Sequence, residues 1–158
     1  MVARKENSAQ VNAAMVRRRF AELDKGNFTI LNELFDSAYV LHFPGIPRPL
    51  SLAATKRFYG MLYAAFPDLR HTVVEQISAR NKVVTRWTAR GTHRAEWMGI
   101  DPTGKRVTFG GINIYTVRRG RLAESRVNWD ILGLAQQLGA TELRLQFGGK
   151  RTGAAAAG

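Results

Sequence analysis

The sequence predicts an α+β fold in which a curved antiparallel sheet packs on N-terminal helices and encloses a pocket. Helical patterns fill the first half of the chain and strand patterns the second, an order typical of α+β proteins. The strand candidates follow one another through short turns, as in an antiparallel meander. Because a long sheet twists and curls away from a single helical layer, we expect a cone-shaped α+β barrel with a pocket at its open end.

A length of 158 residues fits one domain that can bury a substantial core. We expect this single domain to span residues 1–140. A C-terminal tail follows at 141–158, and its low-complexity end, "GGKRTGAAAAG", is expected to be disordered.

The first half contains three helix candidates, at residues 10–23, 28–35 and 52–66. Residues 1–8 are polar and are expected to fray. Gly26 ends the first helix, and Ser51 is placed to cap the third. Between the second and third helices, residues 38–43 are rich in β-branched and aromatic side chains and predict a strand, which a proline-rich loop at 44–49 ends.

The second half contains four strand candidates, at residues 70–78, 82–93, 105–117 and 121–130. Turn signals separate them at 80–81, 99–105 and 118–121. A short helix is expected at 132–138, ending at Gly139.

Composition excludes several classes of function. The chain has no cysteine, so disulfides, thiolate metal sites and a cysteine nucleophile are excluded. The histidines lie far apart without zinc-site spacing, so we expect no metal site. The net charge of +12 is scattered and no nucleic-acid-binding motif accompanies it, so we expect no nucleic-acid partner. No apolar run approaches the length of a membrane span, which favours a cytoplasmic protein without a membrane partner.

Asp130 lies where the last strand candidate meets the last helix candidate, and two roles are open to it. As the residue before a helix, it is a favoured N-cap. As a carboxylate in an apolar pocket, it would have a pKa raised from about 3.9 and could move protons. The two roles oppose each other, because a capping carboxylate accepts backbone hydrogen bonds that lower its pKa.

Strand alternation groups Asp130 with Asn128 and Arg126 on one side, whereas Trp129 and Val127 lie on the other. The Trp129 side is the more apolar, so simple patterning would bury it. If Asp130 faces the pocket, Asn128 and Arg126 do so too and the pocket is partly polar.

Three segments carry a family resemblance: "AAFPDLRHTV" at 64–73, the stretch from "VVTRWTARGTH" to "GGINIY" at 83–115, and "VNWDILGLAQQLG" at 127–139. In this order and spacing they resemble the SnoaL-like polyketide cyclases, which share the cone fold of nuclear transport factor two. The resemblance covers roughly residues 10–140. It implies a deep, mostly apolar pocket and cofactor-independent aldol ring closure on an aromatic polyketide of the anthracycline type. It also implies that Asp130 is the acid–base catalyst.

Two departures from the family pattern leave other functions open. Cyclases of the family pair the aspartate with a histidine on the neighbouring strand, but residues 105–117 contain none, and Arg126 stands where an aromatic residue is common. The alternatives are hydroxylation of an anthracycline-type ring with a reductase-like partner protein, and a non-catalytic small-molecule binding domain.

Substrate contacts are expected from aromatic walls, rim histidines and polar groups near the pocket. Asn113 could hold a substrate carbonyl or be an exposed sheet residue. His42 and His93 could each contact substrate or form hydrogen bonds with the backbone. His71 is expected to be structural or exposed. The candidate substrate-binding residues are His42, Tyr59, Tyr63, Trp87, His93, Trp97, Phe109, Asn113, Arg126 and Asn128.

A homodimer or higher homo-oligomer is expected, because open sheets of this kind commonly cover an outer face or edge with another copy. Thr108, Ile112 and Ile114 are predicted to lie on the outer face and to make that contact.

Overall fold

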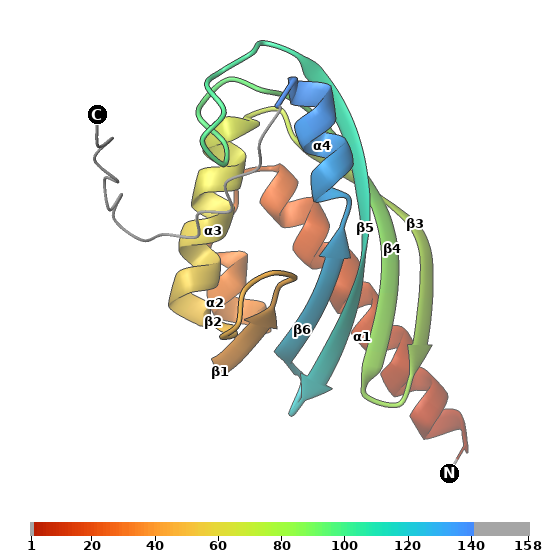
Figure 1. Ribbon diagram of the computed structural model, residues 1–158. Helices are drawn as coiled ribbons and strands as arrows, with labels where there is room; N and C mark the ends of the chain where they lie inside the picture. The colour runs from red at the N-terminus through yellow and green to blue at the C-terminus, as the bar shows by residue number, and fades with distance from the viewer. Residues whose placement is uncertain (1, 141–158) are drawn as a thin grey trace.

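A computed structural model describes residues 2–140 of the chain, with side chains from Ser8 onward. The predicted tail at 141–158 lies outside the described residues. In chain order (Figure 1), the elements are α1 (Val2–Asp24), α2 (Ile30–Leu34), β1 (Phe35–His42), β2 (Leu50–Ser51), α3 (Leu52–Ala65), β3 (Arg70–Ala79), β4 (Lys82–Thr92), β5 (Arg106–Arg118), β6 (Arg121–Trp129) and α4 (Ile131–Leu138). Within residues 2–140, no helix has the length and apolar character that crossing a membrane requires.

The strands form one six-stranded sheet in the order β2-β1-β6-β5-β4-β3. Strands β3 to β6 form the predicted antiparallel meander, which confirms the α+β class. One pairing departs from the predicted antiparallel sheet. Strand β1 runs parallel to β6, with Leu41 opposite Ser125. This pairing joins the two halves of the chain, and local sequence patterns carry no signal for it.

The helices differ from the predictions mainly at their ends. Helix α1 begins at Val2, so the predicted fraying of residues 1–8 is wrong for the backbone from Val2 onward. Helix α2 is one short segment because β1 begins at Phe35, before the predicted start of that strand. Helix α3 has the predicted cap, in which the Ser51 hydroxyl accepts a hydrogen bond from the Ala54 amide at 3.3 Å.

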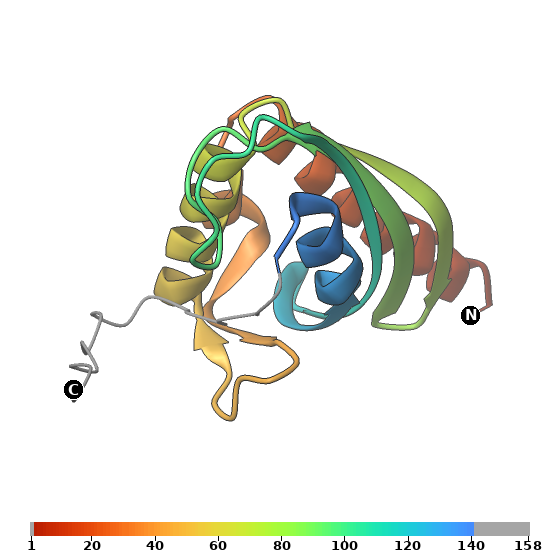
Figure 2. The ribbon, with the colours of Figure 1, turned by 45° about the horizontal axis from the view of Figure 1, so that its top comes forward.

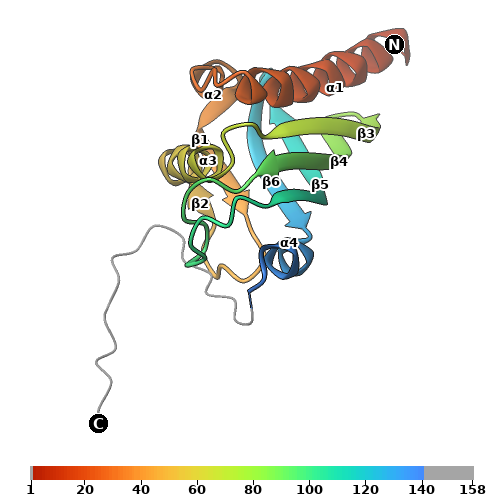
Figure 3. The ribbon, with the colours of Figure 1, turned by 90° about the horizontal axis from the view of Figure 1, so that it is seen from above.

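The sheet curls around an apolar interior that the helices close. Strand β4 alternates strictly, and Val83, Thr85, Trp87 and Ala89 face inward. Helix α1 packs along β3 and β4, whereas α4 packs on β5 (Figure 3), and both helices contribute buried residues to one core. Seen into the open end of the cone, α3 and α4 face each other across the interior (Figure 2). The curled sheet and three helices therefore surround the place where a pocket was predicted.

Gly111 allows the sheet to close tightly over β5. A Cβ atom at this position would lie 2.6 Å from the Trp87 ring, 2.7 Å from the Asn128 carbonyl oxygen and 2.8 Å from the Trp129 Cβ. All three contacts are closer than carbon atoms tolerate, and two of them involve the backbone or Cβ of β6 rather than a movable side-chain end. The absence of a side chain at Gly111 therefore lets Trp87 and Trp129 approach each other across β5.

Replacing Gly111 with Ala should lower the free energy of unfolding by roughly 1–3 kcal/mol, because the added methyl group overpacks this crossing. The matched control is Gly60→Ala, in the interior of α3, where a Cβ meets nothing within 4 Å. That change should raise the free energy of unfolding by roughly 0.5–1 kcal/mol through helix propensity. Urea unfolding measures both; equal stability of the two variants would contradict the role given to Gly111.

Candidate functional site

A cavity lies between α1, α3 and the inner face of the sheet. Its wall is mainly aromatic, formed by Phe20, Phe43, Phe58, Trp87, Phe109 and Trp129. The polar side chains in the wall are Arg19, Tyr59, His71 and Asn113. Among the described residues, no three His, Asp or Glu side chains gather as a metal site would require.

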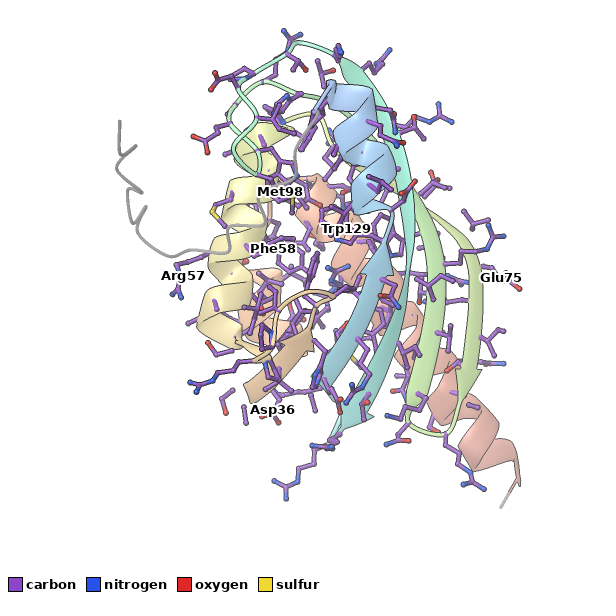
Figure 4. The ribbon with its side chains drawn as sticks, in the orientation of Figure 1. Asp36, Arg57, Phe58, Glu75, Met98 and Trp129 are labelled. Atoms are coloured by element: carbon purple, nitrogen blue, oxygen red, sulfur yellow. The ribbon has the colours of Figure 1, made fainter. Side chains whose placement is uncertain are left out.

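Aromatic rings close the cavity between α3 and the end of β6. Phe58 and Trp129 project into this space from the two sides (Figure 4), with ring centroids 6.1 Å apart. Phe43 packs edge-on against Trp129, with centroids 5.6 Å apart. The cavity volume is about 40 Å³, which is room for a few water molecules. A ring-sized guest therefore enters only when some of these rings turn aside.

His71 and Asp24 form a hydrogen-bonded pair at the cavity wall. Asp24 is the last residue of α1 and His71 is the second residue of β3, so the end of the helix meets the start of the strand. His71 Nδ1 lies 2.7 Å from Asp24 Oδ1, and the His71 amide donates to Asp24 Oδ2 at 2.6 Å. The Tyr63 hydroxyl also donates to Asp24 Oδ1, at 2.8 Å. Three donors therefore hold one carboxylate and fix the orientation of the imidazole.

The surroundings leave Asp24 ionised and His71 neutral. Burial alone would raise the pKa of Asp24, but hydrogen bonds from His71 and Tyr63 outweigh it and hold that pKa below its usual value. Burial lowers the pKa of the His71 imidazole, and the opposing effect of Asp24 does not restore it. With the proton on Nδ1, facing the carboxylate, the Nε2 atom of His71 is free to accept a proton. Since His71 lines the cavity, the arrangement is that of a general base.

Asn113 lies in the cavity wall and is buried, so the alternative of an exposed sheet residue is wrong. Its Oδ1 accepts a hydrogen bond from Trp87 Nε1 at 2.7 Å, and its Nδ2 donates to Ser125 Oγ at 3.1 Å. The amide thereby fixes the Trp87 ring in place. Asn113 is thus engaged with protein partners on both sides of its amide group.

Four of the predicted substrate-binding residues line the cavity: Tyr59, Trp87, Phe109 and Asn113. Two others lie one layer behind the wall. Tyr63 holds Asp24, and Trp97 packs on Phe58, with ring centroids 5.8 Å apart.

Asp130 does not face the cavity. Its side chain is exposed, lies outside the cavity wall and caps α4, where Oδ1 accepts a hydrogen bond from the Gly133 amide at 2.8 Å. A Cβ at position 133 would overlap the carboxylate in its observed position, so a larger residue there would require the Asp130 side chain to shift. Of the two roles that the sequence leaves open to Asp130, the helix cap is therefore the one observed. The catalytic role predicted for Asp130 stays a prediction, and this geometry does not favour it.

The structure does not bring Arg126 and Asn128 to the cavity wall, although both were predicted to contact substrate. Both are exposed, because β6 directs Val127 and Trp129 inward and their neighbours outward. The apolar side of the strand is thus the buried side, as plain patterning indicates.

The two rim histidines were likewise predicted as substrate contacts and lie elsewhere. His42 points away from the cavity, and its Nε2 lies 3.2 Å from Glu124 Oε1. His93 is fully buried outside the cavity wall, where it stacks on Phe66 with ring centroids 5.3 Å apart and lies beside Thr103. Thr108, Ile112 and Ile114 are exposed on the outer face, as predicted.

Sequence reasoning missed Arg19, Asp24 and His71. His71 was expected to be structural or exposed, yet it lines the cavity and only 8% of its side chain is exposed. A signal for Arg19 exists, because it interrupts the apolar stripe of α1 formed with Val16 and Phe20. No comparable signal joins Asp24 to His71, which are 47 positions apart.

The His71 imidazole should titrate below pH 6.5, since burial disfavours its charged form. In Asp24→Asn the midpoint should fall further, because the carboxylate that favours the imidazolium is lost. NMR shifts of the imidazole nitrogens across a pH series measure both midpoints. A rise on substitution would refute the pairing.

Asp130→Ala should lower the free energy of unfolding by about 1 kcal/mol, the usual cost of losing an N-cap side chain. Asp130→Asn keeps a capping oxygen and should lose much less. Chemical unfolding of the two variants provides the measurement. Equal losses in both would mean that the carboxylate charge, rather than the cap, stabilises this end of α4.

Comparison with known proteins places the chain among relatives of one fold. IdmH, a proposed polyketide cyclase from Streptomyces antibioticus, is 28% identical with a TM-score of 0.74, over 82% of this chain and 99% of its own. A proposed polyketide cyclase from Acidithiobacillus ferrooxidans is 29% identical with a TM-score of 0.72, over 81% and 94%. AclR, a proposed hydroxylase from Streptomyces galilaeus, shares the fold at 22% identity and a TM-score of 0.77, over 83% and 97%.

A search of curated protein sequences finds no significant match. A family model described as SnoaL-like polyketide cyclase matches residues 14–138, which span every strand, the C-terminal half of α1 and the cavity. The chain therefore belongs to the SnoaL-like polyketide cyclase family.

Proposed function

We propose that the protein closes a ring in an aromatic polyketide intermediate by acid–base catalysis without a cofactor. The observation that carries this proposal is the Asp24–His71 pair, which presents a neutral imidazole to a cavity with aromatic walls. Aldol ring closure requires a base that can take a proton from carbon and return it to oxygen. One histidine can do both in turn.

In the proposed reaction, His71 Nε2 removes a proton from the carbon next to a substrate carbonyl, leaving an enolate. The enolate carbon then attacks a second carbonyl of the same molecule, which forms the carbon–carbon bond and an alkoxide. The imidazolium returns its proton to the alkoxide, so His71 ends neutral. While His71 is charged, the ionised carboxylate of Asp24 stabilises it and holds the ring in one orientation.

The aromatic walls supply the second part of catalysis. A flat substrate can pack against rings such as Trp87 and Phe109, which excludes water and holds the chain folded for ring closure. Asn113 fixes the Trp87 ring, so this wall is pre-organised. A proton transfer of this kind contributes roughly a hundred- to ten-thousandfold to the rate, and positioning of the substrate accounts for the rest.

Family membership and the two relatives called proposed polyketide cyclases support this choice of substrate. The assignment of the base differs from the one implied by the family resemblance, which pointed to Asp130. His71 is proposed in its place because it lies in the cavity wall and Asp130 does not.

The test incubates the protein with a panel of partly cyclised aromatic polyketides, each as the free acid and as the ester, and follows them by mass spectrometry and NMR. A product of unchanged mass with altered ring connectivity is expected. His71→Gln should reduce kcat/KM by roughly a hundredfold or more, because Gln cannot accept the proton. Asp130→Asn, the matched control outside the cavity, should stay within about threefold of wild type. The wild-type kcat/KM should rise with pH up to a midpoint below 6.5 and then level off.

The other outcomes identify the competing functions. A gain of one oxygen atom that requires a reductant would indicate ring hydroxylation. Binding of the acids or esters without any chemical change would indicate a non-catalytic binding domain. A large loss of rate in Asp130→Asn, with His71→Gln unaffected, would return the catalytic role to Asp130.

A further inference from the structure

Arg19 is a buried cation in the wall of the cavity. It lies on the apolar stripe of α1 and only 4% of it is exposed. Its guanidinium carbon lies 4.4 Å from the centroid of the Phe20 ring and 4.9 Å from that of Tyr59. The Nη2 atom donates a hydrogen bond to the Tyr59 hydroxyl, whereas the buried Nε atom has no partner.

No carboxylate of residues 8–140 forms an ion pair with Arg19. The carboxylate of Asp24, which holds His71 at the cavity wall, already accepts hydrogen bonds from His71 and Tyr63. The surrounding tyrosines do not supply negative charge either, because burial raises the pKa of Tyr115 and of Tyr63 well above neutrality. The guanidinium therefore remains charged without a counter-ion.

A buried cation without a counter-ion destabilises the folded protein unless a ligand supplies the negative charge. Removing a guanidinium from water carries a large penalty, which ring faces and one hydroxyl group offset only in part. An apolar side chain would pack on the same stripe without that penalty. The cavity is therefore where a compensating anion would be expected, since Arg19 lines it together with His71.

We infer that Arg19 binds a carboxylate carried by the substrate, so that the natural guest is an acidic aromatic compound with a free carboxylate. A planar guanidinium matches a carboxylate with parallel hydrogen bonds, and one buried cation balances one negative charge. A phosphate would bring nearly a second charge into apolar walls that offer no second cation. The aromatic character of this guest rests on the proposed function.

The placement of Arg19 also fits the proposed reaction. Phe20 touches both groups, with its ring centroid 5.1 Å from that of His71 and 4.4 Å from the Arg19 guanidinium carbon. A guest anchored by its carboxylate at Arg19 would therefore lie beside His71. Anchoring at one end and proton transfer at the other require a single bound orientation, which is what ring closure needs.

The test compares the binding of 2-naphthoate with that of 2-naphthamide by calorimetry at neutral pH. The two probes have the same ring and differ in charge. We expect the carboxylate to bind at least about tenfold more tightly, the gain typical of a charge-assisted hydrogen-bonded pair. In Arg19→Met this preference should disappear, with little change in the affinity for the amide.

The matched control is Arg57→Met. Arg57 is exposed on α3 next to Phe58 and points away from the cavity (Figure 4), so its removal should leave the preference unchanged. Equal affinities for the two probes in the wild type, failure of the carboxylate to bind, or a preference that persists in Arg19→Met would each overturn the inference.

A measurement on the unmodified protein covers the case in which Arg19→Met does not fold. The net charge of +12 attracts anions to the surface, but that attraction is screened by salt. A preference for naphthoate that holds from about 0.1 to 0.5 M NaCl supports a buried pair, and one that vanishes over this range contradicts it. Because binding is measured without turnover, an inactive protein that keeps the preference would contradict only the proposed catalysis.

Discussion

The contact between Asp24 and His71 is the interaction on which the rest of the site depends. It ties the end of α1 to the start of β3, so one hydrogen-bonded pair sets both the position of the helix against the sheet and the orientation of the imidazole. Without it, the buried ring could adopt either tautomer and several orientations. The carboxylate thus connects fold and chemistry: the geometry that packs α1 on the sheet also leaves Nε2 as the atom that can accept a proton.

The few polar groups of the cavity are each held by a partner. Asn113 is held between Trp87 and Ser125, Tyr59 accepts from Arg19, and His71 is fixed by Asp24. Apolar walls make every such group more costly to leave unpaired and more effective when a substrate group pairs with it. Arg19 differs from these groups because it is charged, whereas its partners in the described part of the chain are neutral.

The predictability of the fold and that of the site differ for physical reasons. The meander follows from alternation within each strand, and the caps at Ser51 and Asp130 follow from local residue types. Trp87 and Phe109, predicted as substrate contacts, line the cavity. The pairing of Asp24 with His71 depends on how a helix end meets a distant strand, which no local pattern encodes. For Asp130 the local signal gave the observed cap, whereas the role implied by resemblance required the strand to turn its polar side inward.

The parallel pairing of β1 with β6 bears on how the chain folds during synthesis. Strand β1 emerges from the ribosome well before β6, the parallel neighbour that fixes it. Contacts between such distant segments are slow to form, because a long loop must close before they are made. The wall that carries Leu41 and Phe43 therefore stays unpaired on that edge until β6 has been made, and until then the nascent chain leaves this side of its aromatic interior uncovered.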